Sequence, residues 1–385
     1  MIVPDYEGGS IVNLMATVAQ VCGSAPDDYP LLRELDTALL ADARTIVLLV
    51  VDGLGNHHVE RRPQSALARH RTARMTSVFP PTTATAITTF MTGLAPQQHG
   101  VTGWHMYLHE IDRIAAILPF RSRQGRQPLE KIGARPREVF GHGSLFDRIA
   151  IASHVVTHQS IVHSVFNTAH AGRARCHAYT RLDELFAVIG RIAAAPERKL
   201  VYAYYPEIDT LAHQFGIGSD EVANQFDALD RAFANFIDGP MPAGTAMLVT
   251  ADHGFIDSPP QRQIEIGSEL PELAALLRRP LCGERRTAYC YVGQPQRTAF
   301  ENYVCDRLAG RALLMTSDDL IGHGFFGRGD PHPRLRQRLG DYALIMQEDR
   351  TIKDWLPGER RYRHIGVHGG ASADEMYVPL IVARR

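Results

Sequence analysis

The sequence predicts an α/β protein with a central, mostly parallel β-sheet flanked by helices. Three apolar runs of the kind found in buried strands end near an aspartate, and they are TIVLLVVDG (45–53), KLVYAYYPEID (199–209) and TAMLVTADHG (245–254). Helical segments are expected at 183–195 and 220–236, between these strands. Strands that alternate with helices form right-handed crossovers, so ligands should bind beyond the carboxyl ends of the strands.

Each of these predicted strands places a carboxylate at its end. Asp52 closes the first run, Asp209 lies just beyond the second, and Asp252 with His253 ends the third. A later run, YVPLIVA (377–383), can supply a final strand of the core. The ends of the strands are therefore the first place to look for a functional site.

The length of 385 residues exceeds what one hydrophobic core usually supports. We expect residues 1–256 and 345–385 to form the metal-binding α/β core and residues 257–344 to form an inserted cap. Within the cap we expect a strand at 285–293, a helix at 297–309, a strand at 312–320 and a loop rich in glycine and proline. A second insertion at 105–141 is basic and turn-rich, and we expect a solvated loop there.

Composition narrows the class of partner. The formal net charge is -1, which gives no electrostatic footprint for a nucleic-acid polymer or an anionic membrane. The N-terminus lacks a basic signal-peptide region, and the five cysteines form no C-x-x-C pair. We expect a cytoplasmic protein that binds a small molecule and does not insert into a membrane. The sequence does not define an oligomeric state.

The stretch SVFPPTTATAITTFMTG (77–93) holds six threonines, although threonine is a mediocre helix former. It follows two prolines and ends at a glycine, so it is typical of a turn that leads into a short helix. A helix N-terminus presents unpaired backbone N–H groups. A threonine hydroxyl held there would lie beside a potential anion site.

Carboxylates and imidazoles at the predicted strand ends form a potential metal site. Asp209 and His213 are four residues apart, so they share one face of a helical turn. A bend before Gly254 would let Asp252 and His253 turn toward one site, and His368 lies in a VHGG motif. Taken singly, each pattern is common in turns. Together they indicate mixed His/Asp ligation, which suits zinc, with manganese as the alternative.

This ordered set resembles the alkaline phosphatase superfamily, and within it the type I phosphodiesterase/nucleotide pyrophosphatase family. The matching pieces are VVDGLG, FPPTTATAITTFMTGLAPQQHG, EIDTLAHQFG, VTADHGF and VHGGASADEMYVPLIV. The resemblance implies an alkaline-phosphatase-like sandwich, with a central mostly parallel sheet flanked by helices, plus a small inserted α+β cap. It also implies hydrolysis of a small-molecule phosphate ester with two divalent metal ions.

The resemblance also assigns roles to residues. The nucleophile of the family stands ten residues before a closing Thr-Gly glycine, which here gives Thr83, with Thr82 as its neighbour. Thr83 would become a phosphothreonine, while Thr85, Thr88, Thr89 and Thr92 would pack or bond back along the helix. One metal would be bound by Asp209, His213 and His368, and the other by Asp52, Asp252, His253 and the Thr83 oxygen.

The sequence departs from the family at one position. Nucleotide pyrophosphatases typically place an asparagine after the HG motif, and here that residue is Trp104, which could contact the substrate. His323 and His332 lie in the glycine-rich cap loop and have no assigned role. We expect a diesterase. The alternatives are a phosphomonoesterase of the alkaline phosphatase type, a metal-dependent phosphosugar mutase-type isomerase, and a binding module without catalysis.

Overall fold

The computed structural model describes residues 1–25 and 28–385 and is built around a seven-stranded sheet in the order β2-β18-β9-β1-β8-β6-β7. Strands β9, β1, β8, β6 and β7 run parallel, and β18 and β2 add an antiparallel edge. The bounds are β1 Thr45–Val51, β2 Arg71–Thr76, β6 Ala152–His158, β7 Arg175–Tyr179, β8 Lys199–Tyr205, β9 Thr245–Thr250 and β18 Tyr377–Arg384. The expected α/β fold is confirmed.

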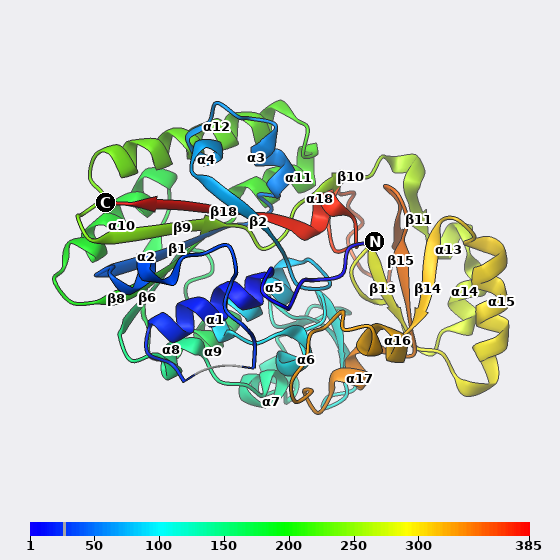
Figure 1. Cartoon of the computed structure of the whole chain (residues 1–385). Coiled ribbons are helices and arrows are strands. Elements are labelled where there is room, and N and C mark those ends of the chain that lie inside the picture. Colours follow the sequence, from blue (N-terminus) through cyan, green and yellow to red (C-terminus); the bar gives the residue numbers. More distant parts are fainter. Residues whose placement is uncertain (26–27) are drawn as a thin grey trace.

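Helices cover both faces of this sheet (Figure 1). One face carries α1 Ile11–Val21, α5 Thr83–Thr92, α8 Leu145–Arg148 and α9 Val165–His170, with α2 Thr37–Ala41 beside α1. The other face carries α3 Asn56–Glu60, α4 Ala66–Arg69, α10 Leu182–Ala194, α11 Glu207–Phe215 and α12 Asp220–Asp238. The helices predicted at 183–195 and 220–236 correspond to α10 and α12. This arrangement explains why the central strands are apolar on both faces.

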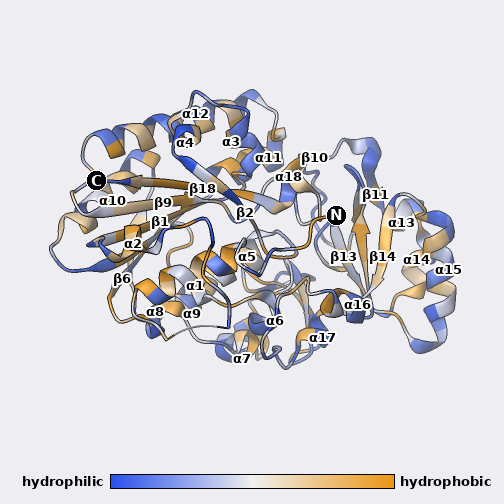
Figure 2. Cartoon of the chain, viewed as in Figure 1, coloured by the Kyte–Doolittle hydropathy of each residue, from blue (hydrophilic) through white to orange (hydrophobic). Residues whose placement is uncertain are grey.

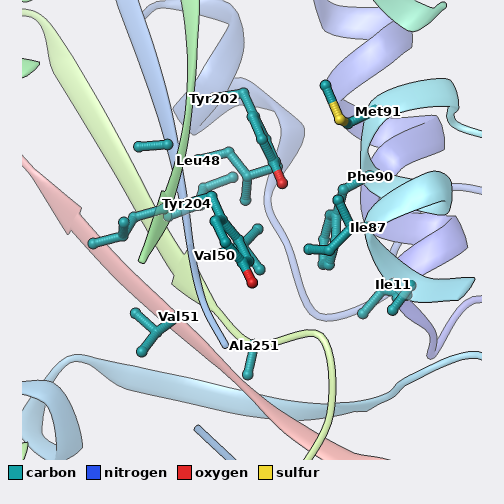
Figure 3. Close-up of a cluster of buried hydrophobic side chains, with 14 of the residues drawn as sticks. Ile11, Leu48, Val50, Val51, Ile87, Phe90, Met91, Tyr202, Tyr204 and Ala251 are labelled. Carbon is teal, nitrogen blue, oxygen red and sulfur yellow. The ribbon is translucent and has the colours of Figure 1, made fainter. Parts of the chain in front are cut away.

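The main core covers both faces of the sheet, and one part of it lies between the sheet and α5. Figure 3 shows Leu48 and Val50 of β1 and Tyr204 of β8 on the side that faces Phe90 of α5, whereas Val51 points to the other side. All seven residues of β1 are buried, as are all seven of β8. Figure 2 shows the same pattern over the whole chain, with apolar strands inside and hydrophilic stretches on the outer helices.

A second seven-stranded sheet lies beside the first, in the order β14-β15-β13-β12-β3-β4-β5, and its neighbouring strands are antiparallel. Its strands are β3 His105–Leu108, β4 Arg113–Ala116, β5 Arg121–Ser122, β12 Cys282–Gly283, β13 Thr287–Cys290, β14 Ala312–Thr316 and β15 Tyr342–Met346. The expected loop at 105–141 was therefore wrong for β3, β4 and β5. β3, β4 and β5 pair with one another in a local meander, and β3 joins the rest of the sheet through β12, which is distant in sequence. The strands are short, so local propensity is a weak signal for them.

The expected strand, helix and strand of the cap correspond to β13, α15 (Arg297–Arg307) and β14. This sheet also takes in β3–β5 and the whole of β15, so it extends beyond 257–344, and the division into domains stays a prediction. The remaining helices are α6 Pro96–His99, α7 Pro136–Phe140, α13 Ile266–Glu269, α14 Pro271–Leu276, α16 Ser317–Gly322, α17 Leu335–Leu339 and α18 Ala373–Met376.

Two small strand pairs connect the parts of the chain near the site. β10 (Ile256–Asp257) is antiparallel to β17 (Gly366–Val367), and β11 (Gln263–Glu265) is parallel to β16 (Thr351–Lys353). The first pair brings the segment after β9 next to the segment that leads to His368. Among the described residues, none of the helices is both long and apolar enough to cross a membrane.

Candidate active site

The carboxyl ends of three adjacent parallel strands meet at one edge of the main sheet. β1 pairs with β8 on one side and with β9 on the other, so the residues that follow these strands lie close together. Asp52 follows β1, and Asp252 with His253 follows β9. α11 begins two residues after β8 and carries Asp209 and His213. The fold alone thus gathers five of the side chains that the sequence singled out.

Thr83 is the first residue of α5, next to the same edge. The helix follows the two prolines, as expected, and ends at Gly93, whose φ of 73° places it in the left-handed region favoured by glycine. Thr83 Oγ1 lies 3.2 Å from His253 Nε2 and 3.4 Å from Asp52 Oδ1. The hydroxyl therefore points into the cluster of carboxylates and imidazoles.

Other threonines of α5 serve the helix itself. Thr88 Oγ1 donates to the Ala84 carbonyl at 2.7 Å, and Thr92 Oγ1 donates to the Thr88 carbonyl. Thr89 Oγ1 lies 3.2 Å from a ring nitrogen of His99. These contacts agree with the expected structural roles, because a threonine in mid-helix can bond back to the preceding turn. Thr85 Oγ1 is buried and has no hydrogen-bond partner among the described residues, and Thr82 and Thr83 are the threonines that line the pocket at the site.

Two groups of side chains have ligand atoms close enough to bind one metal ion each. The first group is Asp209, His253 and His368, and the second is Asp52, Asp252 and His253. His253 Nε2 lies 3.2 Å from Asp52 Oδ1, 3.5 Å from Asp252 Oδ2 and 3.9 Å from Asp209 Oδ1. His253 is therefore shared between the two groups.

His213 and His368 stand on the Asp209 side. The His213 Nε2 atom lies 3.4 Å from Asp209 Oδ1, and His368 Nε2 lies 3.8 Å from the same oxygen. The rings of His253 and His368 stack with centroids 3.7 Å apart. The structure thus brings together all seven residues that the sequence singled out.

The backbone orients the three histidines. Nδ1 of His213 lies 2.9 Å from the Gly366 carbonyl oxygen, Nδ1 of His253 lies 3.0 Å from that of Gly254, and Nδ1 of His368 lies 3.2 Å from that of Pro81. A carbonyl can only accept, so each Nδ1 carries the proton. Each Nε2 is left free as a lone-pair donor, which is the usual arrangement around histidine ligands.

The three carboxyls are crowded and poorly neutralised. Burial, reinforced by the neighbouring Asp52, raises the pKa of Asp252 to about 8. Burial raises the pKa of Asp52 to about 6, and burial with two nearby carboxylates raises that of Asp209 well above its ordinary value. Asp209 Oδ1 and Asp252 Oδ2 are buried and accept no hydrogen bond among the described residues. Such a donor set fits divalent cations, which would supply the missing positive charge.

A pocket of about 350 Å³ opens beside this cluster. One end is formed by the proposed ligands and nucleophile, and the other end lies under the second sheet. The residues that line it beyond the cluster include Thr82, Trp104, Arg123, Glu284, Arg285, Lys353, Asp354, Tyr362 and His364. The expected contact residue Trp104 therefore lies at the pocket.

Sequence reasoning missed Glu284, which enters the pocket beside the nucleophile. Its Oε1 accepts hydrogen bonds from Thr82 Oγ1 at 2.7 Å and from the Trp104 backbone N–H at 2.6 Å. Thr82 occupies the N-cap of α5 but makes no capping bond, because its hydroxyl is directed to Glu284. The motif LCGERR resembles an exposed charged turn, so no local signal marked this residue.

The two histidines of the cap loop lie elsewhere. His323 is exposed and its Nδ1 lies 2.6 Å from the Asp319 carbonyl oxygen. His332 is buried, and its ring lies so close to Gly100 that no side chain would fit there. Neither residue lines the pocket described above.

Comparisons with known proteins agree with this geometry. The family model of type I phosphodiesterase/nucleotide pyrophosphatase matches residues 46–370. None of the curated proteins compared matches the chain. Murine ectonucleotide pyrophosphatase/phosphodiesterase 5 is similar in structure, with a TM-score of 0.66, 15% identity, and 88% of each chain covered.

Two further solved structures are similar. One is an inactive variant of the murine protein, with a threonine replaced by alanine, in complex with AMP (TM-score 0.64, 16% identity, 88% of this chain and 87% of that chain). The other is phosphonoacetate hydrolase from Sinorhizobium meliloti in complex with phosphonoacetate (TM-score 0.65, 15% identity, 89% of this chain and 91% of that chain).

Fold and family match together define a phosphoric ester hydrolase of the alkaline phosphatase superfamily. The chain belongs to the type I phosphodiesterase/nucleotide pyrophosphatase family. The family is metal-dependent, and the described residues of this chain include the two Asp/His groups that could hold metal.

Proposed function

We propose that the protein hydrolyses small-molecule phosphate diesters, with Thr83 as the nucleophile and two divalent metal ions bound at the strand ends. The observation that carries this proposal is the position of Thr83 Oγ1, 3.2 Å from His253 Nε2 and 3.4 Å from Asp52 Oδ1. A threonine hydroxyl at a helix N-terminus, beside three carboxylates and three imidazoles, suits attack on phosphorus.

The proposed ligand sets follow the two sides of the cluster. Asp209, His213 and His368 would hold one ion, and Asp52, Asp252 and His253 would hold the other together with the Thr83 oxygen. Zinc is the expected metal because the donors mix imidazole nitrogen and carboxylate oxygen, with manganese as the alternative. Bound divalent ions would lower the pKa of a coordinated hydroxyl and offset the charge that develops on the phosphoryl oxygens.

Groups of the protein itself would attack phosphorus and bind the phosphoryl oxygens. Thr83 would lose its hydroxyl proton to solvent and attack phosphorus in line with the leaving group. The Thr83 O–P bond forms as the P–O bond to the leaving group breaks, the departing alkoxide takes up a proton, and Thr83 carries the phosphoryl group as a phosphothreonine ester. The N-terminal turn of α5 presents backbone N–H groups toward the phosphoryl oxygens, since the Thr82 hydroxyl does not cap them. Water then hydrolyses the ester and restores Thr83.

A preference for diesters is favoured by the surroundings of the cluster. A monoester dianion commonly needs an arginine clamp for its extra charge. Two arginines line the pocket. The Arg123 side chain is 2% exposed and binds Asp354 and Glu359, and the Arg285 guanidinium lies over the rings of Trp355 and Tyr362. The second sheet and Trp104 offer a wall for the second ester substituent.

The experiment compares kcat/KM for bis-p-nitrophenyl phosphate and p-nitrophenyl phosphate at fixed pH and fixed metal concentration. Faster hydrolysis of the diester supports the proposal. A monoester preference of about tenfold or more, which is about 1.4 kcal/mol of transition-state discrimination, would make a phosphomonoesterase the better description.

Other outcomes correspond to the remaining alternatives. Conversion of a sugar phosphate to its isomer without release of inorganic phosphate would indicate the mutase-type isomerase. Metal-dependent ligand binding without any turnover would indicate a binding module. The relatives in complex with AMP and phosphonoacetate support a small phosphate or phosphonate compound as the ligand class. A cytoplasmic location stays a prediction.

A further inference from the structure

Glu284 is held beside the proposed nucleophile by contacts from two distant loops. Its carboxylate accepts hydrogen bonds from Thr82, the neighbour of Thr83, and from the backbone of Trp104. Its side chain lines the pocket that also contains Thr83, Asp209 and His368. A carboxylate thus lies next to the position where the phosphoryl group would bind.

Three glycines allow the backbone to close around this side chain. Gly369 has a φ of 97°, and a Cβ there would lie 2.8 Å from the Cβ of Glu284. Gly283, the residue before Glu284, has a φ of 79°. Gly103 approaches it so closely that a Cβ on Gly103 would lie 2.8 Å from the Gly283 Cα. Side chains at these positions would push the loops apart, so the close approach requires glycine. The position of Glu284 is therefore built into the fold.

The other charged groups of the pocket have partners of their own. Arg123 binds Asp354 and Glu359, as described above, and Lys353 Nζ lies 3.7 Å from Glu359 Oε1. The Arg285 guanidinium lies over the aromatic rings of Trp355 and Tyr362. None of the described ion pairs joins Glu284 to an arginine or a lysine, and its carboxylate lines the pocket.

We propose that Glu284 is a specificity-determining residue, which selects phosphate diesters by disfavouring a phosphoryl group that carries two negative charges. A bound monoester dianion would place one more negative charge beside the carboxylate than a diester monoanion does. Two negative charges in the same pocket repel each other, and a partly buried pocket screens this repulsion less than bulk water does. This inference rests on the proposed function, because it concerns the same phosphoryl site.

The protonation state of Glu284 decides the pH at which this proposal is tested. Burial raises the pKa of this carboxyl to about 7, and the hydrogen bonds from Thr82 and Trp104 oppose the rise. Assays at about pH 8.5 therefore compare an ionised Glu284 with a neutral replacement. Glu284→Gln keeps the size of the side chain and an oxygen that can still accept both hydrogen bonds.

The experiment measures the ratio of kcat/KM for bis-p-nitrophenyl phosphate to kcat/KM for p-nitrophenyl phosphate. We expect Glu284→Gln to lower this ratio at least about tenfold through a gain in monoester hydrolysis, equivalent to about 1.4 kcal/mol. Glu272→Gln, on the outer helix α14, is the matched control for loss of a carboxylate.

The outcomes separate the two proposals. If the wild type hydrolyses the diester and Glu284→Gln leaves the ratio within about twofold, the role of Glu284 is wrong and the proposed function stands. A variant that merely folds poorly would lose both activities together and would not change the ratio. If the wild type hydrolyses neither ester with zinc or manganese, the proposed function fails and this inference fails with it.

Discussion

Thr83 Oγ1 lies 3.2 Å from Nε2 of His253, and the same Nε2 atom belongs to both groups of potential metal ligands. The hydroxyl therefore stands where the two groups meet, at the positive end of the α5 dipole. This placement favours Thr83 over its neighbour Thr82, whose hydroxyl is hydrogen-bonded to Glu284. The predictions below follow from this relationship and from the packing that supports it.

Replacement of Thr83 should remove turnover. Thr83→Ala deletes the attacking oxygen, so kcat should fall by at least about 10³-fold while circular dichroism and most metal binding are retained. Thr83→Ser keeps the hydroxyl and should retain measurable activity. If Thr82→Ala has no measurable kcat while the kcat of Thr83→Ala remains near that of the wild type, the nucleophile is Thr82.

Gently purified protein should contain about two equivalents of zinc or manganese, because the cluster offers two groups of ligand atoms that share His253, and His213 adds a further imidazole on the Asp209 side. His368→Ala should lower the metal content chiefly on the Asp209 side, and Asp252→Ala should do so on the Asp52 side. Elemental analysis with isothermal titration of the chelator-treated protein measures both losses. The absence of tight metal under conditions that spare ligands would contradict the two-metal assignment.

A buried ion pair should stabilise the loop that carries His368. Arg286 Nε and Nη2 lie 3.1 and 2.9 Å from the two carboxylate oxygens of Glu375, and both side chains are at most 2% exposed. Glu375 also accepts the backbone N–H of Gly370 at 2.7 Å. Arg286→Met leaves a buried carboxylate unpaired, so the free energy of unfolding should drop by about 3–5 kcal/mol in urea denaturation.

The double variant Arg286→Met/Glu375→Gln is the control for that measurement. It removes both charges, so much of the lost stability should return. A single variant as stable as the wild type would show that the pair does not support this loop.

Stability at acid pH should depend on His142, whose two ring nitrogens are buried. Burial, together with His170, lowers the pKa of His142 to about 2, and neither of its ring nitrogens has a hydrogen-bond partner within residues 1–25 and 28–385. The folded state keeps this ring neutral while the unfolded state binds a proton below about pH 6.5. Stability contributed by the neutral ring is therefore lost as the pH falls below that value.

His142→Leu removes the ring whose protonation makes stability depend on pH. The variant should lose less stability than the wild type between pH 7 and pH 5, with a difference of up to about 1.4 kcal/mol per pH unit below pH 6.5. Urea denaturation at several pH values measures the difference, with the exposed His163 as a control in the variant His163→Leu. Parallel pH profiles for wild type and His142→Leu would exclude this role of His142.

The fold and the clustering of the seven side chains could be predicted because their signals are local and repeated. Each apolar strand ends at a carboxylate, and the parallel sheet brings those ends together without any further information. Thr83 could be placed because its helix begins after two prolines and ends at Gly93. The spacing of Asp209 and His213 needed only one helical turn.

Glu284 could not be predicted because its partners are distant in sequence, and β3–β5 were missed because these strands are short. Thr82 and Glu284 are separated by 202 positions, and their hydrogen bond forms only when the second sheet closes over the site. β3 pairs with β12 in the same way. Short edge strands carry weak propensities, so tertiary pairing decides their conformation.

The stereochemical course at phosphorus tests the central claim most directly. A diester made chiral with sulfur and oxygen isotopes would be hydrolysed by the metal-loaded enzyme, and the configuration of the product would be determined by phosphorus NMR. Attack by Thr83 followed by water makes two in-line displacements, each of which inverts phosphorus, so we expect net retention. Net inversion would show a single direct attack by water and would contradict Thr83 as the nucleophile.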